Sequence, residues 1–164
     1  MEIERKFTIK SLPDLDKYDK SMIAQAYLNR DPVVRIRRQD DEYYITYKGK
    51  GLLAREEYNL VLTKEAFDHL LPKADGNVIT KTRYLIPLEN PRFKEGYTAP
   101  KDLSLTIELD VFEGDLAPLI MAEVEFPDTE CADAYLMEDW FLEDVTADRR
   151  YHNVNMVYGD KDNN

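Results

Sequence analysis

The first nine residues, Met1-Glu2-Ile3-Glu4-Arg5-Lys6-Phe7-Thr8-Ile9, are the stretch that decides the fold. With the two-residue period of a β-strand, one face of this stretch is ionic and the other is mostly apolar. Glu2, Glu4 and Lys6 form the ionic face. An ordinary half-buried strand would pack Ile3 and Phe7 inward and turn its charges to water. The same alternation returns in strand after strand, and that repetition argues for a different arrangement.

Length and charge limit the fold class and the partners. A chain of 164 residues is long enough for one domain with a real core and short for two. We expect a single domain over residues 1–158 and a disordered tail over residues 159–164. The formal net charge of −11 and the pI near 4.7 argue against nucleic acid or an anionic membrane as partner. A small anionic ligand would need a local basic site.

The sequence also predicts the compartment. It contains no apolar run of the roughly 18 to 20 residues that cross a bilayer, and it is charged from its second residue, unlike a signal peptide. Its one cysteine, Cys131, cannot form an internal disulfide. We therefore expect a soluble cytoplasmic protein. The sequence is silent on oligomeric state, and a homodimer stays an open alternative to a monomer.

Eight segments have the alternation or composition of β-strands, and most are joined as hairpins. They cover residues 1–9, 23–29, 33–39, 43–48, 54–62, 78–88, 103–113 and 119–127. Helices are expected to end near Lys20, Leu71 and Asp139, and a long loop covers residues 89–102. Strands and helices do not alternate as they would in a parallel sheet. The expected class is α+β, with an antiparallel sheet.

The charged faces of these strands form two sets. The basic set is Lys6, Arg35, Arg37, Lys48, Arg55, Lys81 and Arg83, and the acidic set is Glu2, Glu4, Glu57, Glu108, Asp110, Glu123 and Glu125. If eight antiparallel strands close with these faces inward, they form a barrel with a polar interior, a tunnel, whose apolar outside is covered by the helices. This arrangement inverts the usual β-barrel.

Such a tunnel has to be wet or liganded, because buried charges need partners, water or a metal ion. Carboxylates two residues apart, such as Glu2 and Glu4, repel one another unless a divalent cation lies between them. Oxygen-only sites of this kind suit Mg²⁺ or Mn²⁺. The arginines and lysines offer many donors to phosphate oxygens. A polyphosphate that carries a metal ion fits both sets.

These residues resemble the CYTH superfamily, the triphosphate tunnel metalloenzymes. Glu2-Ile3-Glu4-Arg5-Lys6 matches the ExExK signature of that family, and the likeness covers nearly the whole chain in order. It continues through Gln25-Ala26-Tyr27-Leu28, Val34-Arg35-Ile36-Arg37, Thr46-Tyr47-Lys48-Gly49, Lys81-Thr82-Arg83-Tyr84, Ile107-Glu108-Leu109-Asp110-Val111-Phe112, Ala122-Glu123-Val124-Glu125-Phe126, and Asp148 with Arg150-Tyr151 and Asn153. The resemblance implies an eight-stranded tunnel and metal-dependent chemistry on triphosphates. The small bacterial members that this chain resembles are inorganic triphosphatases.

The resemblance also implies a role for each residue. Lys6, Arg35, Arg37, Lys48, Arg55, Lys81 and Arg83 would bind a linear triphosphate; Glu2, Glu4, Glu57, Glu108, Asp110, Glu123 and Glu125 would bind one or two Mg²⁺ or Mn²⁺ ions; Lys6, Tyr27 and Lys81 would take part in catalysis. Tyr27 has an equally good interpretation as a packing aromatic. Two features depart from the family pattern: the loop at 89–102 is long, and Asn59 stands where an acidic residue is common.

Other functions fit the same residues. A tunnel of this kind could cyclise ATP, or hydrolyse thiamine triphosphate or another organic triphosphate, because the sequence does not identify the group at the tunnel mouth. A protein of a different class, a non-catalytic polyphosphate-binding module, would keep the cations. The retained carboxylates argue against that class, because each uncompensated glutamate weakens anion binding.

Overall fold

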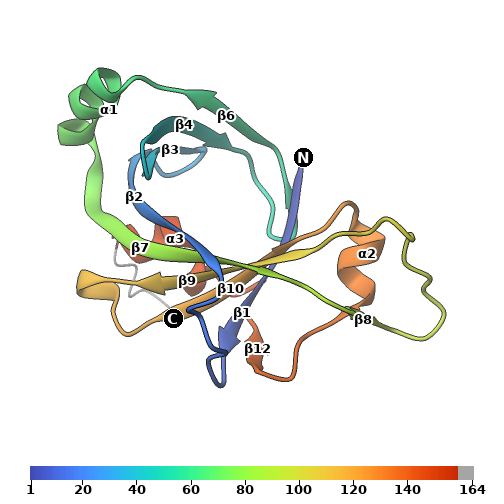
Figure 1. Cartoon of the computed structure of the whole chain (residues 1–164). Coiled ribbons are helices and arrows are strands. Elements are labelled where there is room, and N and C mark those ends of the chain that lie inside the picture. Colours follow the sequence, from blue (N-terminus) through green and yellow to red (C-terminus); the bar gives the residue numbers. More distant parts are fainter. Residues whose placement is uncertain (159–164) are drawn as a thin grey trace.

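The computed structural model describes residues 1–158, in which one large antiparallel sheet curls into a nearly closed barrel (Figure 1). Neighbouring strands follow the order β12-β1-β10-β9-β7-β2-β3-β4-β6. The sheet is built from β1 (Glu2–Ile9), β2 (Asp19–Asn29), β3 (Val33–Gln39), β4 (Glu42–Lys48), β5 (Ala54–Arg55), β6 (Glu57–Val61), β7 (Asp75–Pro87), β9 (Thr106–Phe112), β10 (Ile120–Glu125) and β12 (Phe141–Asp144). The expected fold class, an antiparallel barrel-like sheet with a few helices, is confirmed.

The barrel closes through the segment that was expected to be one strand over residues 54–62. This segment is split at Glu56: β6 pairs with β4, whereas β5 pairs with β1 through Glu2 opposite Arg55 and Ile3 opposite Ala54. The two ends of the sheet therefore meet at only two residue pairs. Within residues 1–158 the sheet has ten strands rather than eight, because of this split and because β12 adds to β1 beyond the ring.

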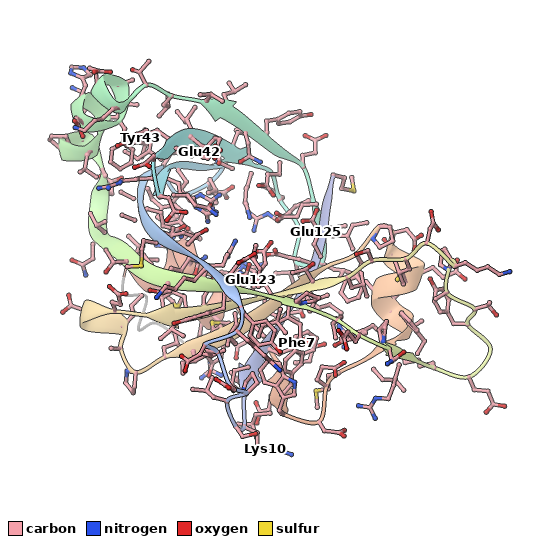
Figure 2. The ribbon with its side chains drawn as sticks, viewed as in Figure 1. Phe7, Lys10, Glu42, Tyr43, Glu123 and Glu125 are labelled. Atoms are coloured by element: carbon pink, nitrogen blue, oxygen red, sulfur yellow. The ribbon has the colours of Figure 1, made fainter. Side chains whose placement is uncertain are left out.

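The pairing register carries the ionic face around the barrel. Glu4 lies opposite Glu125 and Lys6 opposite Glu123 between β1 and β10, and Arg83 lies opposite Asp110 between β7 and β9. Directly opposite residues of an antiparallel pair point to the same face. In Figure 2, Glu123 lies toward the centre that β2, β3, β4 and β6 curve around, whereas Phe7 lies on the other side of the sheet. The ionic face of β1 is therefore the inner face.

The outer face of β1, β9 and β10 holds the main apolar core, in which Phe7, Leu109 and Val124 have no exposed side-chain area. The helix α2 (Thr129–Ala134) adds Cys131 and Ala132 to this core. A second small sheet, β8 (Arg92–Phe93) with β11 (Tyr135–Leu136), also packs there. The long loop at 89–102 contains β8, so part of it covers this apolar face.

The helices differ from the sequence-based expectation in three places. The helix expected to end near Lys20 is absent from the described chain, where β2 already begins at Asp19 and the Asp14 side chain accepts a turn-forming hydrogen bond from the Asp16 amide. The helix expected to end near Asp139 stops at Ala134, because the chain then pairs with β8 as β11. The helix expected to end near Leu71 is present as α1 (Lys64–Leu70), and its N-cap is Thr63, whose side chain accepts from the Ala66 amide.

The third difference is α3 (Asn153–Tyr158), a helix that the sequence analysis did not predict. It contacts β7 and β2, and its Val157 packs with Tyr27 and Ile79. Unlike the helices expected outside the barrel, α3 places its first residue at an interior cavity, described below. Three short 3₁₀ turns complete the helical structure: η1 (Leu71–Lys73), η2 (Gly114–Leu116) and η3 (Arg149–Tyr151). Residues 1–158 include no helix with the length and apolarity to span a bilayer. The expected tail, residues 159–164, lies outside the described residues.

Buried apolar residues on the outer face of the sheet should contribute strongly to the free energy of unfolding. Leu109, with 0% exposure on β9, packs in the outer core, whereas Leu60, with 66% exposure on β6, does not. We expect Leu109→Ala to lower the free energy of unfolding by about 2–5 kcal/mol, because it removes buried methyl groups and leaves a cavity. The matched variant Leu60→Ala should change it by less than about 0.5 kcal/mol. Urea unfolding measures both, and equal losses would contradict the assignment of the core to the outer face.

Candidate active site

The inner face of the sheet surrounds a cavity of about 450 Å³. In the described residues, seven carboxylates and five cations line this cavity. The carboxylates are Glu2, Glu4, Glu42, Glu57, Glu108, Glu123 and Glu125, the cations are Lys6, Arg35, Arg37, Lys48 and Arg83, and Gln39, Tyr44, Thr46, Asn59, Leu85 and Asn153 complete the wall. The cavity thus brings together eleven of the fourteen ionic residues that the sequence analysis assigned to a tunnel.

Asp110 is the buried anchor of the wall. Lys81 Nζ donates to Asp110 Oδ2 at 2.7 Å, and Arg83 donates from Nε to Oδ1 at 2.7 Å and from Nη2 to Oδ2 at 2.8 Å. Asp110 and Lys81 are both 0% exposed. Burial by itself would raise the pKa of Asp110, but the charges of Arg83 and Lys81 outweigh it and hold that pKa below its usual range. Burial lowers the pKa of Lys81 to about 8, although Asp110 opposes the shift.

Arg83 connects this anchor to the carboxylates of the cavity. Its guanidinium pairs with Glu108 and lies 3.3 Å from Glu123. Lys6 Nζ in turn lies 3.6 Å from Glu123 and 3.7 Å from Glu4. Burial acts to lower the pKa of Lys6, but Glu123 and Glu4 raise it above its ordinary value, so Lys6 is charged. One continuous ionic network therefore runs from β7 through β9 and β10 to β1.

The opposite wall, on β2, β3 and β4, has an excess of positive charge. Arg37 donates to Gln25 Oε1 from Nε at 3.0 Å and from Nη2 at 2.7 Å, and Gln25 is itself 3.3 Å from the Tyr27 hydroxyl. Burial, together with the nearby charges of Arg35 and Arg83, lowers the pKa of Arg37 to about 9. Arg35 Nε is buried without a hydrogen-bond partner. Unsatisfied cationic donors on one wall are what an anionic ligand would compensate.

The carboxylates near the start of β1 have an excess of negative charge. Lys48 Nζ lies 3.0 Å from Glu2 and 3.8 Å from Glu57, and Asn59 donates to Glu57 at 3.0 Å. Burial, a hydrogen bond with Glu57 and the nearby Glu4 raise the pKa of Glu2 to about 8. Burial and neighbouring carboxylates also raise the pKa of Glu125. Against the effect of burial, the hydrogen bond between the two carboxyl groups also lowers the pKa of Glu57 to about 2, so Glu2 is the member of the pair that takes up a proton more readily.

Four residues proposed from the sequence do not line this cavity. Lys81, Asp110 and Tyr27 lie on the inner face but outside the lining of this cavity, and each is fully or almost fully buried. Arg55 lines a second cavity instead. The predicted contacts of these four residues with substrate or metal are therefore indirect in this structure.

The sequence analysis gave no site role to some residues that line the cavity or hold its lining in place. Gln25, which holds Arg37, shares a strand face with Tyr27, and Thr46, which donates to Asn59 at 2.6 Å, shares one with Lys48. The same two-residue alternation would have found both, because they lie on the ionic faces already selected. Asn153 is part of the family resemblance but was given no role, because α3 was not predicted.

Comparison with known proteins identifies the family. The sequence model of the CYTH domain matches residues 1–152. The chain belongs to the CYTH domain family. An inorganic triphosphatase of Nitrosomonas europaea is 37% identical to this CYTH protein over 155 residues, 93% of each chain. An inorganic triphosphatase of Acetivibrio thermocellus is 32% identical over 163 residues, 95% of this chain and 92% of the relative.

Solved structures agree with the family assignment. The crystal structure of an inorganic triphosphatase aligns with this CYTH protein at a TM-score of 0.64 and 34% identity, over 96% of this chain and 94% of the other. A Hippeastrum protein with a dominant triphosphatase activity aligns at a TM-score of 0.55 and 15% identity, over 81% of this chain and 83% of the other. That second similarity shows the shared fold alone.

Membership of the CYTH family implies a divalent metal ion, and the donor set of the cavity fits one. The carboxylates offer hard oxygen ligands, and burial together with neighbouring carboxylates raises the pKa of Glu2, Glu108 and Glu125, which a bound cation would counteract. Within residues 1–158 no three acidic, histidine or cysteine side chains are gathered closely enough to hold a metal as they stand. Because Mg²⁺ is commonly held by one or two carboxylates together with water and phosphate oxygens, these carboxylates could hold the ion jointly with an anionic ligand.

The buried anchor predicts a large and specific loss of stability. Asp110→Asn removes the charge that compensates Lys81 and Arg83, and we expect it to lower the free energy of unfolding by about 3–5 kcal/mol. Asp68→Asn is the matched control, because Asp68 pairs with Lys64 at 2.6 Å on the surface. The free energy of unfolding of Asp68→Asn should fall by less than about 1 kcal/mol. Chemical denaturation compares the two, and a loss for Asp110→Asn as small as that of the control would refute the anchoring role.

Proposed function

We propose that this CYTH protein hydrolyses inorganic triphosphate to pyrophosphate and orthophosphate, with Mg²⁺ or Mn²⁺ as cofactor. The observation that carries the proposal is one interior cavity in which five cations face seven carboxylates. Cations alone would suit a free anion, and carboxylates alone would suit a cation. Both together suit a polyphosphate that arrives with a divalent metal ion.

The cations of the cavity would bind the triphosphate. Arg35 and Arg37 bring guanidinium donors from β3, Lys6 and Lys48 bring ammonium groups from β1 and β4, and Arg83 completes the set from β7. Arginine suits this task because its planar guanidinium can bind two phosphate oxygens at once. A bound anion would also satisfy Arg35 Nε and relieve the mutual repulsion of Arg35 and Arg37.

The carboxylates would hold the metal ion. We assign this role to Glu2, Glu4, Glu57, Glu108, Glu123 and Glu125, which line the cavity. When bound, a divalent cation neutralises phosphate charge and lowers the pKa of a water ligand. Asp110 is different, because both of its oxygens already accept from Lys81 and Arg83. We propose that Asp110 supports the site by orienting Arg83 rather than by binding metal.

The protein's own contribution to hydrolysis is to position the phosphates and neutralise their charge. A water molecule attacks the terminal phosphorus in line with the leaving pyrophosphate, and the cavity cations stabilise the charge that develops on it. Lys6 is suited to this because Glu123 and Glu4, at 3.6 and 3.7 Å, raise its pKa and keep its ammonium group charged. Lys81 would act through Asp110 and Arg83, and Tyr27 through Gln25 and Arg37, so we propose both as positioning residues.

The relatives support this proposal. Two proteins that share 37% and 32% identity with nearly the whole chain are named inorganic triphosphatase. The cytoplasm is the proposed compartment, in line with the single cysteine, Cys131, which is buried and free.

The direct test is phosphate release from tripolyphosphate, ATP and thiamine triphosphate, each with Mg²⁺ or Mn²⁺ and with or without EDTA. We expect tripolyphosphate to be the preferred substrate and the chelator to abolish activity. Formation of cyclic AMP from ATP would instead favour a cyclase, and preference for thiamine triphosphate would favour an organic triphosphatase. Metal-independent binding without turnover would favour a binding module.

Two variants separate metal binding from substrate binding. Glu4→Gln should lower turnover by about 100-fold or more while substrate binding changes less, because it removes a proposed metal ligand. Lys6→Ala should weaken both binding and turnover, because the lysine contacts the substrate and its carboxylate neighbours. Steady-state kinetics and equilibrium binding measure the difference. Full activity in Glu4→Gln would overturn the metal assignment.

Metal binding should depend on pH through Glu2. Below the raised pKa of about 8, the Glu2–Glu57 pair carries a proton that a metal ion must displace, so Mn²⁺ affinity should rise as the pH approaches 8. Calorimetric titration of Mn²⁺ at pH 7 in two buffers of different ionisation enthalpy should show release of about one proton. Glu2→Gln should remove most of that release, whereas Glu56→Gln, on the exposed neighbour of Glu57, should keep it. Equal release in wild type and Glu2→Gln would contradict this role of Glu2.

A further inference from the structure

A second cavity, of about 500 Å³, lies beside the candidate active site. The strand β3 begins at Val33 in the second cavity and ends at Gln39 in the first, so the two cavities lie toward opposite ends of this strand. Neighbouring residues line different cavities at two places in the chain: Lys48 and Asn153 line the first cavity, whereas Gly49 and His152 line the second. Within residues 1–158 no residue lines both cavities, so the second is a separate site.

The charge of the second cavity differs in kind from that of the first. Five cations and one carboxylate, Asp31, line it in the described chain, whereas carboxylates outnumber cations in the active-site cavity. The cations are Arg30, Lys50, Arg55, Arg149 and Arg150. This positive concentration lies in a chain whose net charge is −11. A cavity with donors and almost no carboxylates suits an anion that carries no metal ion.

Only some of these cations are compensated within the protein. Arg150 Nη2 lies 2.6 Å from Asp148, and Arg30 donates to Asn155 Oδ1 at 3.1 Å. By contrast, among residues 1–158 no carboxylate lies within ion-pair distance of Lys50, Arg55 or Arg149. Arg55 Nε is moreover buried without any hydrogen-bond partner. A buried donor that is left unsatisfied costs free energy, and a bound acceptor would remove that cost.

Two of these cations extend from tightly folded backbone. Gly51 has a φ of +135°, and a Cβ there would lie 2.1 Å from the Ala54 carbonyl oxygen, so the loop that presents Lys50 is tightly folded. Arg149 is presented by η3, where Asp148 accepts from the Arg150 amide at 3.1 Å. Asn155 Nδ2 fixes the Arg149 carbonyl with a 2.7 Å hydrogen bond. This framework fixes the backbone from which Lys50 and Arg149 extend, so only their side chains need to be ordered when a ligand binds.

We propose that the second cavity binds a free phosphate oxyanion, orthophosphate or pyrophosphate, without a metal ion. Lys50, Arg55 and Arg149 are the donors. The proposed function enters only as the source of the ligand, because the reaction releases both anions next to this cavity. A product bound there would not compete with substrate for the active-site cations.

The test is a titration of the full-length protein with orthophosphate, and separately with pyrophosphate, in EDTA, followed by the backbone amide NMR signals of the glycines. Gly49 and Gly51 line the second cavity, whereas Gly76, Gly96 and Gly114 do not. We expect at least one of the two anions to shift the Gly49 and Gly51 signals saturably. The double variant Lys50→Glu/Arg149→Glu should weaken this binding by about tenfold or more, because it reverses two of the donor charges.

Two controls make the result specific. The double variant Lys20→Glu/Lys101→Glu makes the same change in net charge at exposed positions outside both cavities and should bind as wild type does. Arg37→Ala, in the active-site cavity, should leave the Gly49 and Gly51 shifts in place. No saturable shift with either anion, or equal affinity in Lys50→Glu/Arg149→Glu, would overturn the proposal. Saturable binding without hydrolysis of tripolyphosphate would overturn the proposed function alone and leave this site standing.

Discussion

The buried ion pairs of Asp110 with Lys81 and Arg83 are the interactions on which the interior of this barrel depends. A carboxylate with no exposed surface is tolerated because two cations satisfy both of its oxygens. Arg83 is fixed by this contact, and its remaining donors then meet Glu108 and Glu123 in the cavity. The network therefore runs from a fully buried ion pair toward the side chains that line the cavity. Such an arrangement gives the cavity side chains defined positions before any ligand binds.

The ionic interior requires an unusual arrangement of the apolar residues. Because the strands turn their charges inward, their apolar side chains need cover from outside the barrel. That cover comes from α2, from the small β8–β11 sheet and from β12, whose Phe141 stacks on Phe7 with ring centroids 4.6 Å apart. The long insertion between β7 and β9 is thereby explained in part, since Phe93 in it packs on Tyr97 and Tyr135. The main core of this protein is a layer around the barrel, and a second apolar cluster, in which Tyr27, Ile79 and Met121 pack near Val157 of α3, fills part of the inner side.

Most of the sheet could be predicted from the sequence, because alternation within a strand is a local property. The β3 segment was predicted with its observed bounds, and the other main strands were found with shifts of a few residues at their ends. Three features were not predictable in this way. The split at Glu56 serves ring closure, the early end of α2 reflects the pairing of Tyr135 with Phe93, and α3 depends on the packing of Val157 against Tyr27. Each is decided by a partner that is distant in sequence.

By itself the sequence determined which side chains share a face, and hence that carboxylates and cations would meet inside a closed antiparallel sheet. Only the tertiary structure decided how deep each one lies and which partner it meets. A period of two identifies the face of a strand but not the position along the barrel axis, because that position depends on the register between strands. For this reason Asp110 and Lys81 are fully buried and do not line the active-site cavity. Arg55, which lies opposite Glu2 in the register, lines the second cavity instead.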